Sequence, residues 1–495
     1  MLFNSHEFIL FLLIAFILSF IFPACFRWIV LLFASCFFYM SWGPAYIIVI
    51  LIIVIVTYGC SNNIHSSGTK QQKKLWLGIC ILTIVGCLLV FKYFPFATRT
   101  LENLSLLGNK FGPPKYYDAA IPIGISFYAL QALGYAIDVY RKNYTPERHF
   151  GKVFLFISFF PLILSGPIER ARNLLSQFGD TPKLKTDNIV LGCKRILWGL
   201  FKKIVIADKL ALIIDPIYET PYSHNGISLV AAILLFSVQI YCDFSGYCDI
   251  AIGAARLFGY RLSENFDRPY FAHSVQEFWR RWHMTLTSWL RDYLYMPLGG
   301  NRKSRLRWFL NIISVYLIAG LWHAAGWNFI VWGLLNGLIY LVGVTTKAWR
   351  QDMYHRIGID RFTRTQRFIK PFITFTIISF CWVFFRVNEL STSMHIFRQI
   401  AIDIFSLTDL MKLHNYNLFS LLALANFSQI EIVTYFSFLL FFVMADGLGW
   451  VNRYLLIENQ NKVTLHELLL LNFIILSLLL LGDGESRAFI YFQFK

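Results

Sequence analysis

Long, nearly uncharged apolar segments recur along this 495-residue chain and limit the folds open to it. Crossing about 30 Å of hydrocarbon takes roughly 20 helical residues, and several segments approach that length. Hydrophobic residues make up 57% of the chain, charged residues 15%, and the mean hydropathy is +0.55. A soluble domain is usually ~45–50% apolar and ~25% charged. The chain is therefore predicted to be an all-α polytopic membrane protein.

The candidate spans are shorter than an ideal membrane helix in several places. They lie at 8–22, 28–42, 45–58, 75–91, 121–139, 153–164, 227–244, 309–321, 327–344, 372–385, 432–450 and 465–481. Short spans indicate tilted, kinked or half-inserted helices, and about eleven crossings, plus or minus two, are expected.

Two further stretches are amphipathic instead of spanning. Residues 284–296 alternate apolar and polar side chains before a Pro/Gly turn, which suits a re-entrant or in-plane helix. Residues 189–218 space basic side chains among aliphatic ones, as an interfacial helix would. These basic residues are Lys194, Arg195, Lys202, Lys203 and Lys209.

Basic residues between the spans predict the topology. Lys70, Lys73 and Lys74 follow the third candidate span, and loops rich in Lys and Arg stay on the cytoplasmic side. Counting back three spans places the N-terminus outside the cytoplasm. No internal repeat or long linker divides the chain, so residues 1–495 are predicted to form a single membrane domain.

The charge and the motifs exclude several function classes. The formal net charge of +17 comes largely from short loops between apolar segments, where Lys and Arg meet anionic lipid headgroups. Membrane lipids, and no nucleic acid, are therefore the expected partner. The nine cysteines form no CxxC pair, and there is no HExxH, GxGxxG or GxxxxGK[ST] motif. We expect no metal site and no nucleotide hydrolysis.

Two histidines are candidates for chemistry. His283 and His323 lie 40 residues apart, and each directly follows a tryptophan. His323 ends one apolar run and begins another, and an ionisable residue inside a membrane segment is a candidate functional residue. A neutral imidazole can take a proton from a hydroxyl, as acyl transfer to an alcohol requires. A hydrogen-bonded histidine that packs two helices together is the alternative.

Arginines surround His283 in the sequence. Arg280, Arg281 and Arg291 could bind a phosphate or carboxylate, or polarise a thioester carbonyl. A belt of arginine and tryptophan that anchors a helix among headgroups fits the same pattern.

Two carboxylates near the end of another apolar run form a third candidate group. Asp243 and Asp249 could orient a catalytic histidine or bind a cation, and they could equally cap a helix that breaks near Gly246. Intramembrane Asp, Arg and His also mark ion and substrate paths, so a non-enzymatic transporter is the rival to an enzyme.

Seven motifs, in order along the chain, resemble those of the membrane-bound O-acyltransferase family, and within it the alginate O-acetyltransferase branch. They are IPIGISFYALQALGYAIDVYR (121–141), SGPIER (165–170), DFSGYCDIAIGAARLFGY (243–260), NFDRPY (265–270), FWRRWHMTLTSWLRDYLYMPLGGNR (278–302), LWHAAGWNFIVWG (321–333) and FIYFQF (489–494). The resemblance implies a bundle of tilted helices around a tunnel that crosses the membrane.

The resemblance also implies roles for individual residues. It makes His323 the essential catalytic histidine and His283 the second family position. The expected donor- and substrate-binding residues are Arg280, Arg281, Arg291, Asp292, Trp322, Asp243 and Ser245. The family reaction transfers an acyl group, here acetyl, from acetyl-CoA or another acyl thioester to a hydroxyl, and no cofactor is expected to be bound permanently.

The expected partners follow from the same branch. They are an extracytoplasmic polysaccharide, either an alginate-like exopolysaccharide or peptidoglycan, and a separate esterase-like acetyltransferase of the SGNH type. The expected location is the bacterial cytoplasmic (inner) membrane. A D-alanyl-type acyltransferase for teichoic acid, supplied by an acyl carrier protein, is the alternative within the family.

Overall fold

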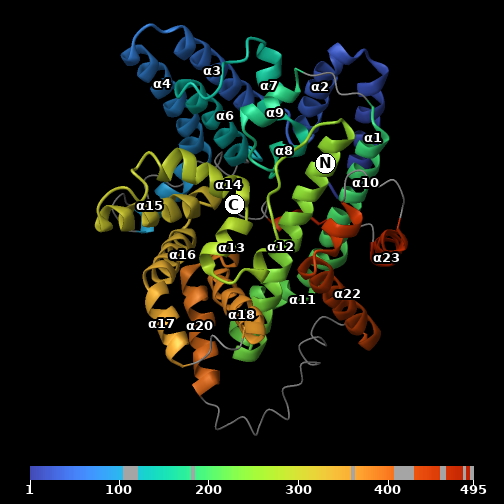
Figure 1. Cartoon of the computed structure of the whole chain (residues 1–495), viewed down its shortest axis with the longest axis vertical. Helices are drawn as coiled ribbons and strands as arrows, with labels where there is room; N and C mark the ends of the chain where they lie inside the picture. Colours follow the sequence, from blue (N-terminus) through green and yellow to red (C-terminus); the bar gives the residue numbers. More distant parts are fainter. Residues whose placement is uncertain are drawn as a thin grey trace.

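The computed structural model of the chain describes residues 1–103, 121–179, 184–357, 363–405, 428–456, 464–482 and 487–490. Residues 491–494 of the FIYFQF motif lie outside this set. The described part is helical throughout (Figure 1). Its first half contains α1 (His6–Ile21), α2 (Arg27–Met40), α3 (Tyr46–Ser66), α4 (Lys70–Leu88), α5 (Phe94–Asn103), α6 (Ile125–Tyr140), α7 (Phe150–Ser158), α8 (Phe160–Ile163), α9 (Ala171–Gln177), α10 (Thr186–Leu200) and α11 (Asp208–Glu219). Its second half contains α12 (Gly226–Leu257), α13 (Val275–Arg281), α14 (Met284–Leu290), α15 (Arg305–His323), α16 (Trp327–Thr345), α17 (Lys347–Arg356), α18 (Thr363–Cys381), α19 (Val383–Arg386), α20 (Leu390–Phe405), α22 (Gln429–Gly447) and α23 (Leu465–Leu481).

The lengths of these helices confirm the polytopic membrane class. Among the described residues, six helical segments are long and apolar enough to span a membrane: Tyr46–Ser66, Lys70–Thr98, Gly226–Leu257, Arg305–His323, Trp327–Thr345 and Thr365–Arg386. Shorter apolar helices are His6–Ile21, Ala24–Met40, Val433–Gly447 and Leu465–Leu481. The number of crossings stays a prediction.

The expected span at 153–164 does not form one continuous helix. Residues 153–164 form the end of α7 and the single turn α8, because the backbone is extended at Phe159 (ψ 115°). Pro161 stands in the first turn of α8, where its missing N–H group is tolerated, and a proline there favours a new helix start over continuation.

Helix α12 runs through the middle of the molecule (Figure 1), and α10, α11, α18 and α20 pack along it. Its contact with α10 is backbone to backbone. A Cβ atom added to Gly199 would lie 2.7 Å from the carbonyl oxygen of Gly246, and one added to Gly253 would lie 2.7 Å from that of Gly192. Small residues permit such close approach of helices in lipid, where van der Waals packing supplies much of the association energy.

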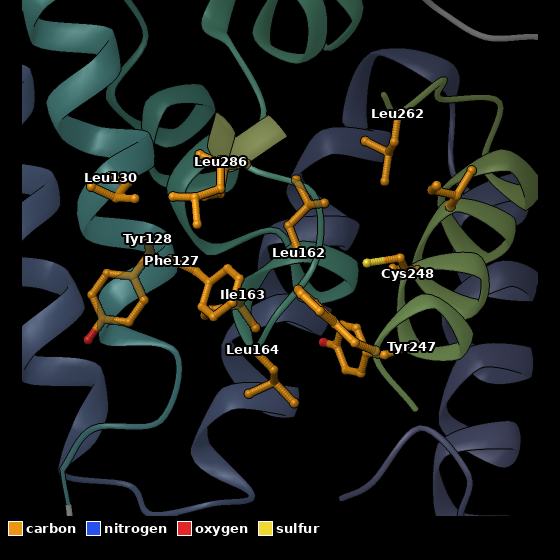
Figure 2. Packing of buried hydrophobic residues seen from close by; sticks show 14 of the residues in the cluster. Phe127, Tyr128, Leu130, Leu162, Ile163, Leu164, Tyr247, Cys248, Leu262 and Leu286 are labelled. Carbon is orange, nitrogen blue, oxygen red and sulfur yellow. The ribbon is translucent and has the colours of Figure 1, made fainter. Parts of the chain in front are cut away.

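Glycines also allow α15 and α16 to pack backbone to backbone. A Cβ atom at Gly320 would collide with the carbonyl of Phe329, and one at Gly333 with the carbonyl of Tyr316. This close pair carries His323 at its end. A separate contact joins α6, α8 and α12. Figure 2 shows Phe127 and Tyr128 of α6 and Tyr247 of α12 in one buried cluster with α8.

The prediction of an interfacial helix at 189–218 is wrong for the central part of that segment, which is buried. The segment folds as α10, a π-helical turn (Phe201–Ala207) and α11, and Lys202 and Lys203 are only 4% and 1% exposed. Lys203 pairs with Asp243 at 2.5 Å, and Lys202 pairs with Asp249 at 2.5 Å. A charged side chain can stay buried when it is paired with a side chain of opposite charge. Because these carboxylates come from α12, the spacing of the lysines alone could not distinguish a buried helix from an interfacial one.

Candidate active site

His323 is the last residue of α15, and aromatic rings surround its imidazole. Its ring centroid lies 4.8 Å from that of Trp322, 5.3 Å from Trp332 of α16 and 5.1 Å from Phe385 of α19. The backbone becomes extended at Ala324 (φ −153°, ψ 157°), so the helix ends where the histidine stands. The imidazole of His323 therefore lies at the C-terminal end of α15, in contact with three aromatic rings.

His283 precedes α14 and is 2% exposed. Its backbone is left-handed (φ 45°), a conformation that a non-glycine residue adopts at a cost of about 1–3 kcal/mol and that is concentrated at functional sites. Nδ1 of His283 lies 3.1 Å from Oδ1 of Asn265. The same oxygen accepts from the backbone N–H of Thr285 at 3.2 Å and from its hydroxyl at 2.9 Å.

These contacts determine the tautomer of His283. A backbone N–H can only donate, so the Asn265 atom facing Thr285 is the amide oxygen and not the nitrogen. Nδ1 of His283 faces that oxygen and therefore carries the proton. In the neutral ring Nε2 then has the free lone pair, and within the described residues Nε2 has no hydrogen-bond partner. Nε2 is therefore the basic nitrogen of this ring.

The ring of Trp322 packs against both histidines. Its ring centroid is 5.9 Å from that of His283 and 4.8 Å from that of His323. The indole Nε1 donates to the carbonyl of Ser126 at 3.1 Å, and Phe127 packs edge-on at 5.1 Å. Residues 40 positions apart in the sequence thus belong to one site.

Charged residues near His283 already have protein partners. Arg281 pairs at 2.6 Å with the carboxylate one turn earlier in α13. Asp292 lies 3.1 Å from Arg170 and 2.9 Å from Arg291. Arg280 is exposed. Binding of a donor by these residues stays a prediction.

Asp243 and Asp249 do not cap a broken helix, because α12 continues through both. Asp243 accepts from Lys203 and, at 2.7 Å, from a backbone N–H near the C-terminus. Asp249 pairs with Lys202, which also donates to the Ser245 hydroxyl at 2.8 Å. Lysine ammonium groups thus occupy the places where a cation could have bound. Within the described ranges, no group of three or more His, Cys, Asp or Glu side chains is arranged to hold a metal.

A polar cavity of about 440 Å³ lies between α10, α12 and α22, and neither His283 nor His323 lines it. Its walls include Lys202, Ser245, Asn265, Arg268 and Asp446, and Asn265 also contacts Nδ1 of His283. Ser245 was expected from the sequence to belong to the site, and the other four were missed. The NFDRPY motif contains two of them and was the available signal.

Comparison with known proteins agrees with this arrangement. The family model described as "MBOAT, membrane-bound O-acyltransferase family" matches residues 147–388. A probable alginate O-acetylase from Azotobacter vinelandii is 34% identical over 417 residues, which cover 83% of this chain and 80% of that protein. A peptidoglycan O-acetyltransferase from Helicobacter pylori is 36% identical over 75% of this chain and 72% of its own. A teichoic acid D-alanyltransferase from Bacillus subtilis is 27% identical over 53% of this chain and 67% of its own.

The fold defines a polytopic membrane protein, and its interior holds a buried histidine, His283, and a half-buried one, His323. The chain belongs to the membrane-bound O-acyltransferase family and is an O-acyltransferase.

Proposed function

We propose that this protein is a membrane O-acetyltransferase that serves an extracytoplasmic polysaccharide, with a cytoplasmic thioester as donor and acetyl-CoA as the first donor to test. Relatives that are named as an alginate O-acetylase and a peptidoglycan O-acetyltransferase support the acetyl group and these two acceptor classes. The observation that carries the proposal is the pair His283 and His323, which both pack against the ring of Trp322.

In this proposal His323 receives the proton of the acceptor. The hydroxyl oxygen attacks the carbonyl carbon of the thioester while its proton passes to the neutral imidazole. The C–S bond then breaks, and the sulfur leaves as a thiol with that proton. If the imidazole attacks first, an acetyl-imidazole forms and the hydroxyl cleaves it, with the same overall balance. His283 is the second proton acceptor, through Nε2.

The remaining site residues receive roles from where they lie. Trp322 packs against both imidazoles and holds their orientation, and Ser245 contributes a hydroxyl to the cavity wall. The cationic side chains of Arg280, Arg281 and Arg291 are assigned to the anionic part of the donor, and Asp292 is assigned to holding Arg291 in place. Asp243 has its carboxylate occupied by Lys203 and a backbone N–H, so its role is to hold the fold.

The proposal includes a location and a partner. Acetyl thioesters are made in the cytoplasm and the polysaccharide lies outside, so the acetyl group crosses the bacterial cytoplasmic membrane within this single domain. The N-terminus is on the outer side, in keeping with the basic loop at Lys70, Lys73 and Lys74. An extracytoplasmic esterase-like protein of the SGNH type completes transfer to the polymer.

The test is the O-acetyl content of each envelope polysaccharide in a deletion strain with and without the wild-type gene. Loss of ester-linked acetate from one polymer, restored by the gene, would support the proposal and identify the acceptor. Loss of ester-linked D-alanine from teichoic acid, with acetate unchanged, would favour the D-alanyl reaction. Unchanged esters in every polymer would refute both.

A further inference from the structure

A lysine inside a membrane-spanning helix contacts the end of the helix that carries His323. Lys92 lies within the segment Lys70–Thr98. Its Nζ atom donates to the carbonyl oxygen of Trp322, to that of His323 at 3.1 Å, and to the hydroxyl of Ser126 at 2.9 Å. All three acceptors are neutral oxygen atoms. Taking an ammonium group out of water and placing it among neutral partners is costly, which indicates that the cation has a use there.

The next residue extends the contact. The hydroxyl of Tyr93 donates to the carbonyl of Leu321 at 2.9 Å. The last four carbonyls of an α-helix have no partner within the helix. In α15, those of Leu321, Trp322 and His323 accept from Lys92 and Tyr93. A positive charge at this end also interacts favourably with the helix dipole.

The helix that carries Lys92 and Tyr93 changes from α-helical to π-helical geometry at these two residues. Residues Leu89–Tyr93 form a π-helical turn between α4 and α5. Successive residues of a regular α-helix point about 100° apart, and a wider turn reduces that angle. Single π-helical turns are frequent at functional sites, and this one directs two neighbouring side chains to one helix end.

Helix α6 completes the junction. Ser126 accepts from Lys92 through its hydroxyl and from the indole of Trp322, at 3.1 Å, through its backbone carbonyl. Three helices therefore meet at the peptide groups on either side of His323, and Lys92 contacts two of them directly.

We propose that Lys92 is a positioning residue for acyl transfer. With Tyr93 it caps the C-terminus of α15 and fixes the backbone of His323, and hence the direction of the imidazole. Lys92 makes and breaks no bond with the substrate. The inference rests on the proposed catalytic role of His323. Misplacement of a reacting group by ~1 Å can cost about 100-fold in rate, so a cap of this kind has a measurable effect.

The experiment uses full-length variants expressed in the deletion strain, with O-acetyl content divided by the amount of protein in the membrane. We expect Lys92→Met to lower this ratio by about tenfold or more, as loss of charge-assisted hydrogen bonds implies. Lys92→Arg keeps donors for the same carbonyls and is expected to recover to within about threefold of wild type. Tyr93→Phe, which removes one oxygen atom, is expected to lower it about two- to fivefold. Lys74→Met, an exposed lysine on the same helix, is the matched control and leaves the ratio unchanged.

Rescue by arginine separates positioning by a cationic donor from a simple packing role. A wild-type ratio in Lys92→Met, or equal losses in Lys92→Met and Lys92→Arg, would overturn the inference. If Lys92→Met does not reach the membrane, Tyr93→Phe is the deciding variant. A wild-type acetylation ratio in Tyr93→Phe would then overturn the inference. His323→Ala is measured alongside: acetylation by that variant would instead refute the proposed role of His323.

Discussion

Nδ1 of His283 lies 3.1 Å from Oδ1 of Asn265, and the same oxygen accepts two hydrogen bonds from Thr285. This relationship fixes the proton of His283 on Nδ1 and leaves the lone pair on Nε2. Asn265 also lines the polar cavity between α10 and α12. One side chain thus connects the cavity wall with the tautomer of a buried histidine.

Replacement of Asn265 tests that connection. Asn265→Leu removes the acceptor for Nδ1–H and is expected to lower acetylation per membrane-inserted molecule by about 10- to 100-fold, because a buried donor left without an acceptor costs ~1–3 kcal/mol. Asn265→Asp keeps an oxygen facing His283 and is expected to retain more activity than Asn265→Leu. Equal activity of Asn265→Leu and wild type would show that the contact has no role in the reaction.

Trp322 provides a graded test of the packing around the two histidines. Trp322→Phe keeps a ring against them but loses the hydrogen bond to Ser126, whereas Trp322→Ala loses both. We expect activity to fall in the order wild type, Trp322→Phe, Trp322→Ala, with about a tenfold step for the lost ring. The measurement is the same acetate ratio, and a Trp322→Ala protein as active as wild type would contradict the role given to the indole.

Buried Lys203 gives a prediction about stability. It pairs with the half-buried Asp208 at 2.9 Å and the buried Asp243 at 2.5 Å, so Lys203→Met leaves both carboxylates without this cation. Breaking a buried ion pair from one side costs about 3–5 kcal/mol. Thermal unfolding of the purified protein in detergent should show a clearly lower midpoint than for Lys185→Met, an exposed control in the same region. Matching midpoints would indicate that the lysine is not needed for folding.

The contact between α10 and α12 makes a second stability prediction. A Cβ atom at Gly199 would lie 2.7 Å from the carbonyl oxygen of Gly246, whereas at Gly78 of α4 it would meet open space. Gly199→Ala is expected to destabilise by ~1–3 kcal/mol through overpacking, and Gly78→Ala to be neutral or slightly stabilising, because alanine favours helix. The melting midpoints of the two variants should therefore shift differently, and a common shift would argue against backbone-to-backbone packing.

The fold class could be predicted from the sequence because several segments are apolar over a length that only a membrane requires. Contacts that depend on tertiary partners could not be predicted. Hydropathy ends the fourth expected span at residue 91, because Lys92 interrupts the apolar run. The helical segment instead continues through the π-helical turn into α5, which ends at Asn103, and two of the three acceptors of Lys92 lie 230 and 231 residues away in the sequence.

The candidate site divides in the same way. His283 and His323 could be selected from the sequence because each is an ionisable residue in an apolar or aromatic setting. That both pack against Trp322 follows from where α15 ends relative to α14, which spacing does not encode. Asp243 and Asp249 looked like functional carboxylates, but their lysine partners in the π-helical turn after α10 were interpreted as facing headgroups, so their pairing was missed.

The central claim is that His323 carries out acyl transfer, and one measurement tests it most directly. Polysaccharide O-acetyl content is determined in the deletion strain carrying wild type, His323→Ala or His65→Ala, with each protein quantified in the membrane. His65 is an exposed histidine near the end of α3 and serves as the matched control. We predict that His65→Ala acetylates like wild type and that His323→Ala, at the same membrane level, gives no acetate above the deletion strain. Wild-type acetylation by His323→Ala would contradict the account.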